Sequence, residues 1–269
     1  MTSAGDNRFQ DFFEDEKYVA LKNYLYSYLL RKRAVEKAML NENKDVVLDI
    51  GSGISPVLTS WDRVVYSDLS FSALRQLRRL HAKGHYVVAD GMNLPFKADS
   101  FSHAISSEVM EHLEDDRKAL REIAGVIRQG GALVVTFPHR HFYFSHDDRF
   151  VNHHRRYELP EMMLLLNGVG LHPIFVKKVL GPLEKITMLV VTVCITILQG
   201  LEGKERSRDH QAKPFGARIS LFKWTNRLYA GLAWIDAFIA PRTLSTVLLI
   251  KAVRKEGHEE RSQPHGTRD

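Results

Sequence analysis

Residues 47–53 read Val-Leu-Asp-Ile-Gly-Ser-Gly, and this stretch decides the fold. A short, mostly apolar run followed by a glycine turn is typical of a buried strand that ends at a binding loop. Gly51 and Gly53 have no Cβ, so the backbone N–H groups of the turn can approach a ligand closely. We expect a helix-compatible segment next, although the chain continues Ile54-Ser55-Pro56 and lacks the third glycine of the dinucleotide fingerprint.

Short β-rich runs alternate with helical patterns on both sides of this turn. The expected strands between residues 45 and 138 are DVVLDI, RVVYSDL, HYVVAD, SHAISSE and ALVVTFP, and two more are expected at 171–180 and 245–254. The expected helices include 70–81, 115–128 and 160–167. This alternation implies right-handed crossovers and a sheet covered on both faces. The sequence therefore predicts an α/β fold: a doubly wound, seven-stranded Rossmann-like sheet.

The chain divides into five expected parts. Residues 1–43 form an N-terminal helical segment with an amphipathic helix over Tyr18–Leu40, and residues 44–180 form the Rossmann-like domain. Residues 181–244 form a hydrophobic helical insertion, far longer than an ordinary connection, before the last strand at 245–255. A polar tail, 256–269, ends the sequence.

Composition limits the partners. A net charge of +6 and a pI near 9.3 make the surface mildly basic, but the cations are scattered, so nucleic acid is not favoured. The single cysteine, Cys194, excludes an intramolecular disulfide and a multi-cysteine zinc site. The first residues, MTSAGDNRFQDFFEDE, lack the pattern of a secretory signal, so we expect a cytoplasmic protein.

Three carboxylates follow successive strands. Asp49 precedes the glycine turn, where it would repel a pyrophosphate but suits a cofactor that carries an amino group and a sulfonium. Asp68 ends the next strand, where a carboxylate accepts hydrogen bonds from ribose hydroxyls. Asp90 ends the third and is followed by apolar residues that suit an adenine. Ligands of open α/β sheets bind at this carboxyl edge, so the sequence predicts a nucleoside cofactor there.

These segments resemble the class I S-adenosylmethionine-dependent methyltransferases, in particular the type 11 subgroup, whose members act on small molecules and lipids. The resemblance spans about residues 44–180 and rests on VLDIGSG, the acidic end of RVVYSDLS, the run from ADGMNLPF to GGALVVTFP, and HHRRYELPEMMLLLNGVGL. It implies S-adenosyl-L-methionine as the cofactor. His103 departs from the aspartate that the family commonly has there.

Carried over by position, the resemblance implies a cofactor site at successive strand ends. Asp49, Gly51 and Gly53 surround the methionine part, Asp68 with Leu69 binds the ribose side, and Asp90, Gly91 and Met92 contact the adenine. Ser107 and Glu108 would line the reactive side of the cofactor.

Methyl transfer is an in-line displacement that requires placement of the acceptor and exclusion of water, while a general base is optional. If the acceptor is a hydroxyl, His139 and His141, which follow the fifth strand and should face the cleft, are candidate bases beside Glu108. A cluster of His146, Asp147, Asp148, His153 and His154 follows, but its spacing matches no strong metal signature, and no metal site is predicted.

The insertion bears on the acceptor. Residues 186–201 form an uncharged run that is short of the roughly 20 residues of a membrane-spanning helix, and 215–241 mixes aromatic side chains with Arg and Lys. The two segments either form only a cap over the cleft or form a cap that also contacts an anionic membrane at its inner surface. Either arrangement favours an apolar or lipid-linked small-molecule acceptor, with O-methylation preferred over N- or C-methylation.

Two other functions remain open. An NAD(P)-dependent oxidoreductase would use the same kind of sheet, but Asp49 and the incomplete glycine fingerprint disfavour it. A non-catalytic module that binds a membrane surface or a partner would retain the fold, but the intact set of carboxylates argues against a decayed site. The sequence makes no prediction about the oligomeric state.

Overall fold

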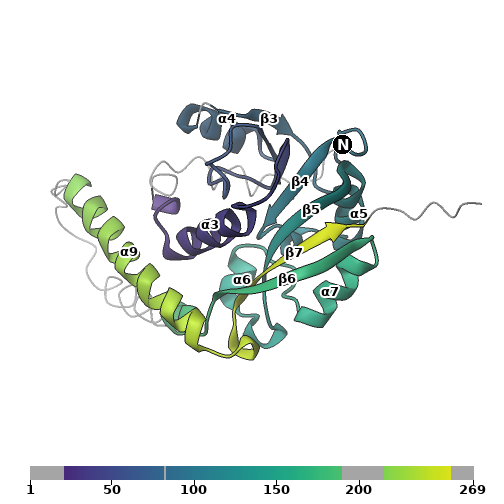
Figure 1. The fold of residues 1–269 in the computed structure, drawn as a ribbon. Coiled ribbons are helices and arrows are strands. Elements are labelled where there is room, and N and C mark those ends of the chain that lie inside the picture. The colour runs from purple at the N-terminus through teal and green to yellow at the C-terminus, as the bar shows by residue number, and fades with distance from the viewer. Residues whose placement is uncertain (1–20, 82, 190–214, 256–269) are drawn as a thin grey trace, which may run out of the picture.

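A computed structural model describes residues 21–81, 83–189 and 215–255 of the chain (Figure 1). Its centre is a seven-stranded sheet in the order β3-β2-β1-β4-β5-β7-β6. All neighbours pair in parallel except β7, which runs antiparallel to β5 and β6. The strands are β1 (Val47–Ile50), β2 (Val64–Asp68), β3 (His85–Val88), β4 (Phe101–Ser107), β5 (Ile127–Pro138), β6 (Leu171–Leu180) and β7 (Val247–Arg254). The prediction of a doubly wound, seven-stranded α/β fold is confirmed.

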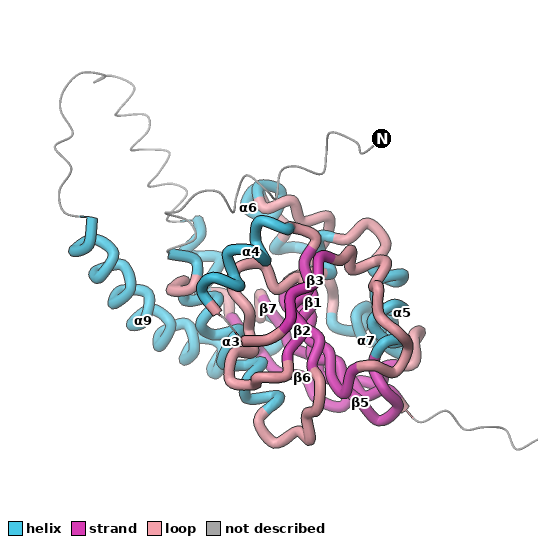
Figure 2. Tube along the Cα trace, turned by 90° about the horizontal axis from the view of Figure 1, so that it is seen from above, coloured by secondary structure: helices cyan, strands magenta, loops and turns pink. Residues whose placement is uncertain are grey.

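Helices cover both faces of the sheet, as the view in Figure 2 shows. The helices α5 (Asp116–Val126) and α7 (Leu159–Asn167) pack on one face, and α3 (Tyr26–Met39) and α4 (Phe71–Leu80) pack on the other. The short elements α6 (His146–Phe150), η1 (Met110–His112), η2 (His141–Tyr143) and η3 (Arg242–Leu244) lie in the connections. Because the strand interiors are apolar on both sides, each face contributes a buried core.

The connection between β1 and β2 corrects one expectation. No helix follows the glycine turn, and residues 54–63 are turns and irregular chain. Pro56 has no backbone N–H to give to a helix, and its carbonyl accepts a hydrogen bond from the Tyr28 hydroxyl at 2.9 Å. Val57 and Leu58 are buried in the same core as the apolar side of α3. The N-terminal helix therefore covers the face that a crossover helix would cover.

The N-terminal helix is also shorter than the pattern over Tyr18–Leu40 indicated. Residues 21 and 22 are helical, but Leu25 has an extended backbone with ψ 133°, and α3 begins only at Tyr26. Residues 18–20 lie outside the described part of the chain. The break orients the segment before α3 across the carboxyl ends of the parallel strands, where Lys22 lies close enough to Asp68 to interact electrostatically with it.

The insertion contributes α9 (Phe215–Ile239), which packs against α3 and β6. The side of α9 that faces the domain carries small buried residues, Ala233 and Ala237. Residues 190–214 lie outside the description, so the apolar run over 186–201 is described only as far as residue 189. Within the described ranges, no helix has both the length and the apolar character that crossing a membrane requires.

Candidate functional site

The glycine turn after β1 is held to the end of β2 by Asp68. One Asp68 carboxylate oxygen accepts the Gly53 backbone N–H at 2.8 Å, and the other accepts the Ser70 backbone N–H at 2.8 Å. Gly51 and Gly53 have φ values of 65° and 53°, in the left-handed region that favours glycine. A Cβ on Gly51 would stand 2.5 Å from a Val109 methyl group, so this position also needs glycine for space. The turn is thus fixed in shape, and each Asp68 oxygen keeps a second lone pair for a ligand.

Asp49 is buried at the end of β1 beside this turn, with 1% of its surface exposed. Burial is the main cause that raises its pKa to about 7, the Val57 backbone N–H opposes the rise by donating to the carboxylate, and the nearby Asp68 adds to it. Burial also raises the pKa of Asp68, against the effect of its two backbone donors and of Lys22. Two carboxylates in a dry pocket repel each other, and a cation placed between them would relieve the repulsion.

Asp90 organises the next strand end. Its carboxylate accepts the Met92 backbone N–H at 2.8 Å and the Asn93 side-chain amide at 3.2 Å, which closes a turn of the Asx type. Gly91 faces Ile50 and Leu113, because a Cβ there would lie 3.7 Å from each. Leu69, directly after Asp68, is exposed. These positions form an apolar border beside two carboxylates, a surface that suits a planar base next to a ribose.

The end of β4 supplies the side of the site that faces α3. The Ser107 hydroxyl is hydrogen-bonded to the Thr136 hydroxyl at 2.9 Å. Glu108 has φ 56°, a left-handed conformation that costs a non-glycine residue energy and that clusters at functional sites. One Glu108 oxygen lies 3.4 Å from the Arg31 guanidinium of α3. The strained turn therefore presents the Glu108 side chain to the helix that covers the site.

Several buried polar atoms at this edge have no hydrogen-bond partner within the described chain. They come from β1 and its turn, from β4, and from α3: Asp49 Oδ2, Ser52 Oγ, Ser55 Oγ, Ser106 Oγ, Glu108 Oε1 and Arg31 Nε. An unsatisfied buried group costs about 1–3 kcal/mol, so a native protein normally satisfies such groups with water or a ligand. Both acceptors and a cationic donor are present, as a zwitterionic cofactor requires.

Two cations at this edge were not predicted from the sequence. Burial and the nearby Arg31, against the opposing effect of Asp68, together lower the pKa of Lys22 to about 8. Arg31 pairs with Glu108, as described above. The signal in the sequence was the placement of Lys and Arg between the aromatic residues of the N-terminal helix. Only the packed structure shows that Lys22 lies near Asp68 and Arg31 near Glu108.

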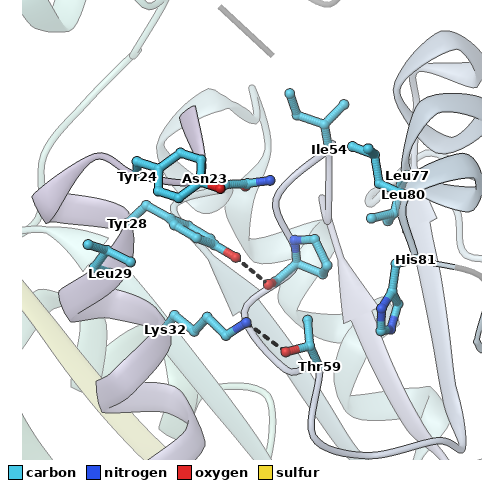
Figure 3. Close-up of a pocket in the computed structure, with 11 residues that line it drawn as sticks. Asn23, Tyr24, Tyr28, Leu29, Lys32, Ile54, Thr59, Leu77, Leu80 and His81 are labelled. Atoms are coloured by element: carbon cyan, nitrogen blue, oxygen red, sulfur yellow. Dashed lines mark hydrogen bonds between the residues drawn. The ribbon is translucent and has the colours of Figure 1, made fainter. Parts of the chain in front are cut away.

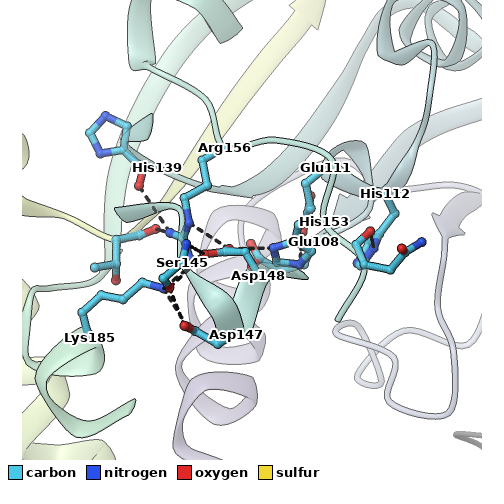
Figure 4. A network of polar contacts seen from close by, with 12 residues as sticks. Glu108, Glu111, His112, His139, Ser145, Asp147, Asp148, His153, Arg156 and Lys185 are labelled. Atoms are coloured by element: carbon cyan, nitrogen blue, oxygen red, sulfur yellow. Dashed lines mark hydrogen bonds and ion pairs between the residues drawn. The ribbon is translucent and has the colours of Figure 1, made fainter. Parts of the chain in front are cut away.

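The two histidines proposed as bases are held by different neighbours. His139 is buried, and its Nδ1 lies 2.9 Å from the Ser245 carbonyl. Burial lowers the pKa of His139, and the Ser245 carbonyl opposes this effect. His141 is exposed and its Nε2 lies 3.1 Å from the Glu161 carboxylate of α7. In Figure 4 the His139 ring points away from the network that contains Glu108. The His139 ring is thus held by the segment before β7, and the His141 ring by α7.

A network of polar side chains joins η1, α6 and the segment before α7 (Figure 4). The Asp148 carboxylate pairs with Arg156 at 2.7 Å, His153 at 2.9 Å and Lys185 at 3.4 Å. Burial by itself would raise the pKa of Asp148, but these partners hold it well below the usual range. Glu111 is completely buried, and burial, then Glu108, raises its pKa well above the usual range. Of the histidine and aspartate cluster after β5, Asp148 and His153 are therefore internal rather than surface residues.

An apolar pocket of about 380 Å³ lies on the other side of the glycine turn (Figure 3). Tyr24, Tyr28 and Leu29 of the N-terminal segment line one side, and Leu77 and Leu80 of α4 line the other. Ile54 and Pro56, just after the glycine turn, form its wall, but the three aspartates do not line it. The pocket is therefore adjacent to the carboxylate site and distinct from it.

Comparison with known proteins agrees with this geometry. Residues 48–135 match the model of the family described as "Methyltransferase domain". This part of the chain, which runs from β1 into β5, is thus similar to a methyltransferase domain.

Two curated relatives match parts of the chain. A demethylmenaquinone methyltransferase of Streptomyces griseus is 30% identical over 110 residues, which cover 39% of this chain and 48% of the relative. A malonyl-acyl-carrier-protein O-methyltransferase of Salmonella typhimurium is 35% identical over 94 residues, which cover 34% of this chain and 38% of the relative. The matched region thus spans less than half the length of each relative.

Solved structures share the fold over most of the chain. A chain from the Haloferax volcanii complex of the Trm112 methyltransferase activator with a methyltransferase superposes with a TM-score of 0.63, at 18% identity, over 93% of this chain and 98% of that one. Phosphoethanolamine N-methyltransferase 2 of Haemonchus contortus, in complex with S-adenosyl-L-methionine, superposes with a TM-score of 0.55, at 17% identity, over 95% of this chain and 61% of that one. At such identities the likeness shows the fold alone.

Proposed function

We propose that this protein transfers a methyl group from S-adenosylmethionine to an apolar or lipid-linked small molecule. The observation that carries the proposal is the set of acidic side chains at the carboxyl edge, Asp49, Asp68 and Asp90, beside a glycine turn of fixed shape. S-adenosylmethionine supplies the activated methyl group when it is bound. The following steps concern what the residues of this chain do.

Charge complementarity supports the placement of the cofactor. Asp49 would hold the amino group and the sulfonium of the cofactor, and Asp68, whose two oxygens each accept one backbone N–H, would accept hydrogen bonds from the ribose hydroxyls through its remaining lone pairs. The cofactor also has a carboxylate, and Lys22 and Arg31 provide the cations for it on the α3 side. Because these groups are buried, each interaction is stronger than it would be in water.

The acceptor side is apolar. The pocket next to the glycine turn is lined mainly by aromatic and aliphatic side chains, and a second apolar groove of about 240 Å³ lies between α3 and α9, with Leu29, Leu30 and Trp234 among its lining residues. The names of the two relatives, which act on a demethylmenaquinone and on a malonyl group attached to a carrier protein, support an acceptor with a lipid-like or carrier-linked character.

For a hydroxyl acceptor, a base must take the proton that the oxygen loses. Glu108 is the candidate whose position favours this role, because its Oε1 is buried and has no hydrogen-bond partner within the described chain. His139 and His141 stay predictions for this role, since Ser245 and Glu161 engage their rings in this structure.

We further propose that α9 contacts the cytoplasmic surface of an anionic membrane. Large apolar side chains are exposed along one side of the helix at helical spacing: Trp224, Leu228, Leu232, Ile235, Phe238 and Ile239. The small residues of α9 face the domain instead, which reverses the pattern of an ordinary surface helix. Arg227, which is exposed on the same helix, supplies a cation that an anionic headgroup attracts.

Methyl transfer is tested by incubating the purified protein with S-adenosylmethionine labelled in its methyl group and a total lipid extract, followed by mass spectrometry of the organic phase. The proposal expects a labelled product that S-adenosylhomocysteine suppresses and that Asp49→Asn reduces. Label that appears only in a water-soluble product would contradict the acceptor class, and a folded protein without any transfer to lipids or to small polar acceptors would contradict the activity.

Membrane contact is tested by flotation with vesicles that contain phosphatidylglycerol or only phosphatidylcholine. We expect the protein to float with the anionic vesicles, and the double variant Trp224→Ser, Phe238→Ser to stay behind without loss of thermal stability. Leu164→Ser is the matched control, since Leu164 is an exposed apolar residue on α7. Equal flotation of all three proteins would remove the role of α9.

A further inference from the structure

Glu111 in η1 is the buried acid that methyl transfer leaves unexplained. Its side chain is 0% exposed, and neither carboxylate oxygen has a hydrogen-bond partner within the described chain. Leaving a carboxylate in this state costs free energy unless a cation or a proton compensates it. The His153 ring is a neighbour that could share a cation with Glu111, because its Nε2 lies 3.7 Å from Glu111 Oε1.

The His153 ring is held in the orientation that a metal ligand needs. Its Nδ1 lies 2.9 Å from Asp148 Oδ1, and its backbone N–H donates to the Asp148 carbonyl at 2.8 Å. Asp148 is in turn fixed by Arg156. A histidine that gives one ring nitrogen to a carboxylate and turns the other toward a metal is a recurrent arrangement, because the carboxylate sets the tautomer and makes the free nitrogen more basic.

His112 completes the group from the other side. Its Nδ1 lies 3.3 Å from the Asn152 carbonyl, and its ring packs edge-on against the His153 ring with centroids 4.7 Å apart. Asn152 has φ 62°, so the chain adopts a left-handed conformation at the residue whose carbonyl orients His112.

We propose that Glu111, His112 and His153 form a binding site for a divalent transition-metal ion, with zinc as the best-suited ion. One ligand atom from each residue lies within 4.8 Å of the other two. Zinc binds nitrogen and oxygen at about 2.0–2.2 Å, which separates two ligands by roughly 3.4 Å, so the side chains need only a small approach. Two histidines and one carboxylate are a ligand set that zinc uses in catalytic sites.

The site adjoins the reactive edge without belonging to the cofactor cradle. Glu111 lies three residues after Glu108 in the connection that follows β4. Three protein ligands leave a fourth position for water or for an oxygen atom of a bound molecule. All three ligands come from η1 and the segment 148–153, so zinc binding at this site does not depend on methyl transfer.

The sequence did not predict this site because its ligands come from separate segments. The cluster from His146 to His154 has no metal-binding spacing by itself, and only His153 of that cluster takes part. Asp147 pairs with Lys185, and Asp148 acts as the partner of His153. Glu111 and His112 lie about forty residues earlier in the chain and meet His153 only in the fold.

The test is a titration of the chelator-treated, full-length protein with zinc chloride, in competition with a chromophoric zinc indicator. We expect saturable binding of a single equivalent and a rise in thermal midpoint on zinc addition. Glu111→Gln and His153→Ala should each weaken zinc binding by at least about 100-fold, since each removes a direct ligand and changes of outer partners alone cost 10–100-fold. His154→Ala is the matched control, because His154 is the exposed neighbour on the same segment, and its affinity should be unchanged.

Glu111→Gln also separates loss of a ligand from loss of the fold. The variant replaces a buried, unpartnered carboxylate by a neutral group of equal size, so without zinc it should be at least as thermally stable as the wild type. A folded wild-type protein that binds no stoichiometric zinc would overturn the proposal. Zinc binding of equal affinity in the wild type, Glu111→Gln and His153→Ala would overturn it as well, because the ion would then be held elsewhere.

Discussion

Replacement of Asp49 by asparagine should raise the stability of the cofactor-free protein while it lowers cofactor affinity. In the fold, burial raises the Asp49 pKa from its ordinary value of 3.8 to about 7. Between these two pH values the folded protein keeps a proton that the unfolded chain has released, so stability falls as the pH rises from about 4 to about 7 and is level above that. The difference corresponds to about 4 kcal/mol.

Asparagine has no proton to lose in this range, so the variant escapes that penalty. Its amide oxygen can accept the Val57 N–H in place of the carboxylate, but its NH₂ group occupies a position where Asp49 Oδ2 has no partner within the described chain. A buried amide without a partner costs about 1–3 kcal/mol. The net expectation is a gain of about 1–3 kcal/mol at pH 8 and, because the amide penalty remains while the relief is absent, a loss of about 1–3 kcal/mol at pH 4.

Urea denaturation of the cofactor-free wild type and variant, at a series of pH values from 4 to 8, measures this difference. The wild type should lose stability across the series and Asp49→Asn should lose less of it. Asp62→Asn is the control, since Asp62 is exposed and pairs only with Lys83 in the described chain, and its curve should follow that of the wild type. Parallel curves for Asp49→Asn and the wild type, or a less stable variant at pH 8, would refute the reasoning.

Three further substitutions test the geometry of the site. Asp68→Asn loses an acceptor of the Gly53 or Ser70 N–H, so the unfolding free energy should decrease by about 1–2 kcal/mol. The affinity for S-adenosylhomocysteine, measured by calorimetry, should decrease as well, and an unchanged affinity would contradict the role of Asp68. Gly51→Ala places a Cβ against Val109 at a position where φ is 65°. The variant should bind the cofactor more weakly and unfold at a lower temperature than the wild type. An unchanged thermal midpoint would show that the turn is not constrained. Tyr157→Phe removes a hydroxyl that donates to Asp116 at 2.8 Å, so denaturant titration should show a decrease of about 1–3 kcal/mol in unfolding free energy. The cofactor affinity should be retained. A lower affinity with an unchanged unfolding free energy would contradict this structural role of Tyr157.

The sheet was predictable from the sequence because its information is local. Each strand is a short apolar run that ends in a turn signal, and the alternation with helical patterns fixes a parallel arrangement. The same locality explains why the positions of Asp49, Asp68 and Asp90 could be predicted: each lies within two residues of the carboxyl end of a parallel strand, so its place at that edge follows from the fold class.

The parts that sequence reasoning missed depend on contacts between distant segments. The pattern of α3 indicates an amphipathic helix, but it does not show that this helix covers the face next to a β1–β2 connection without a helix. His139 and His141 are two residues apart and were expected to face one cleft. Arg140 between them has φ 72°, so the chain turns and directs their rings to Ser245 and Glu161.

Calorimetric titration of the folded wild-type protein with S-adenosylmethionine measures the affinity and stoichiometry of cofactor binding at the acidic strand ends. The experiment does not require the methyl acceptor. We expect saturable binding with a stoichiometry of one, and affinity that falls as the pH drops below about 7, where Asp49 takes up its proton. No detectable binding at pH 8, by a protein with a cooperative unfolding transition, would contradict the account.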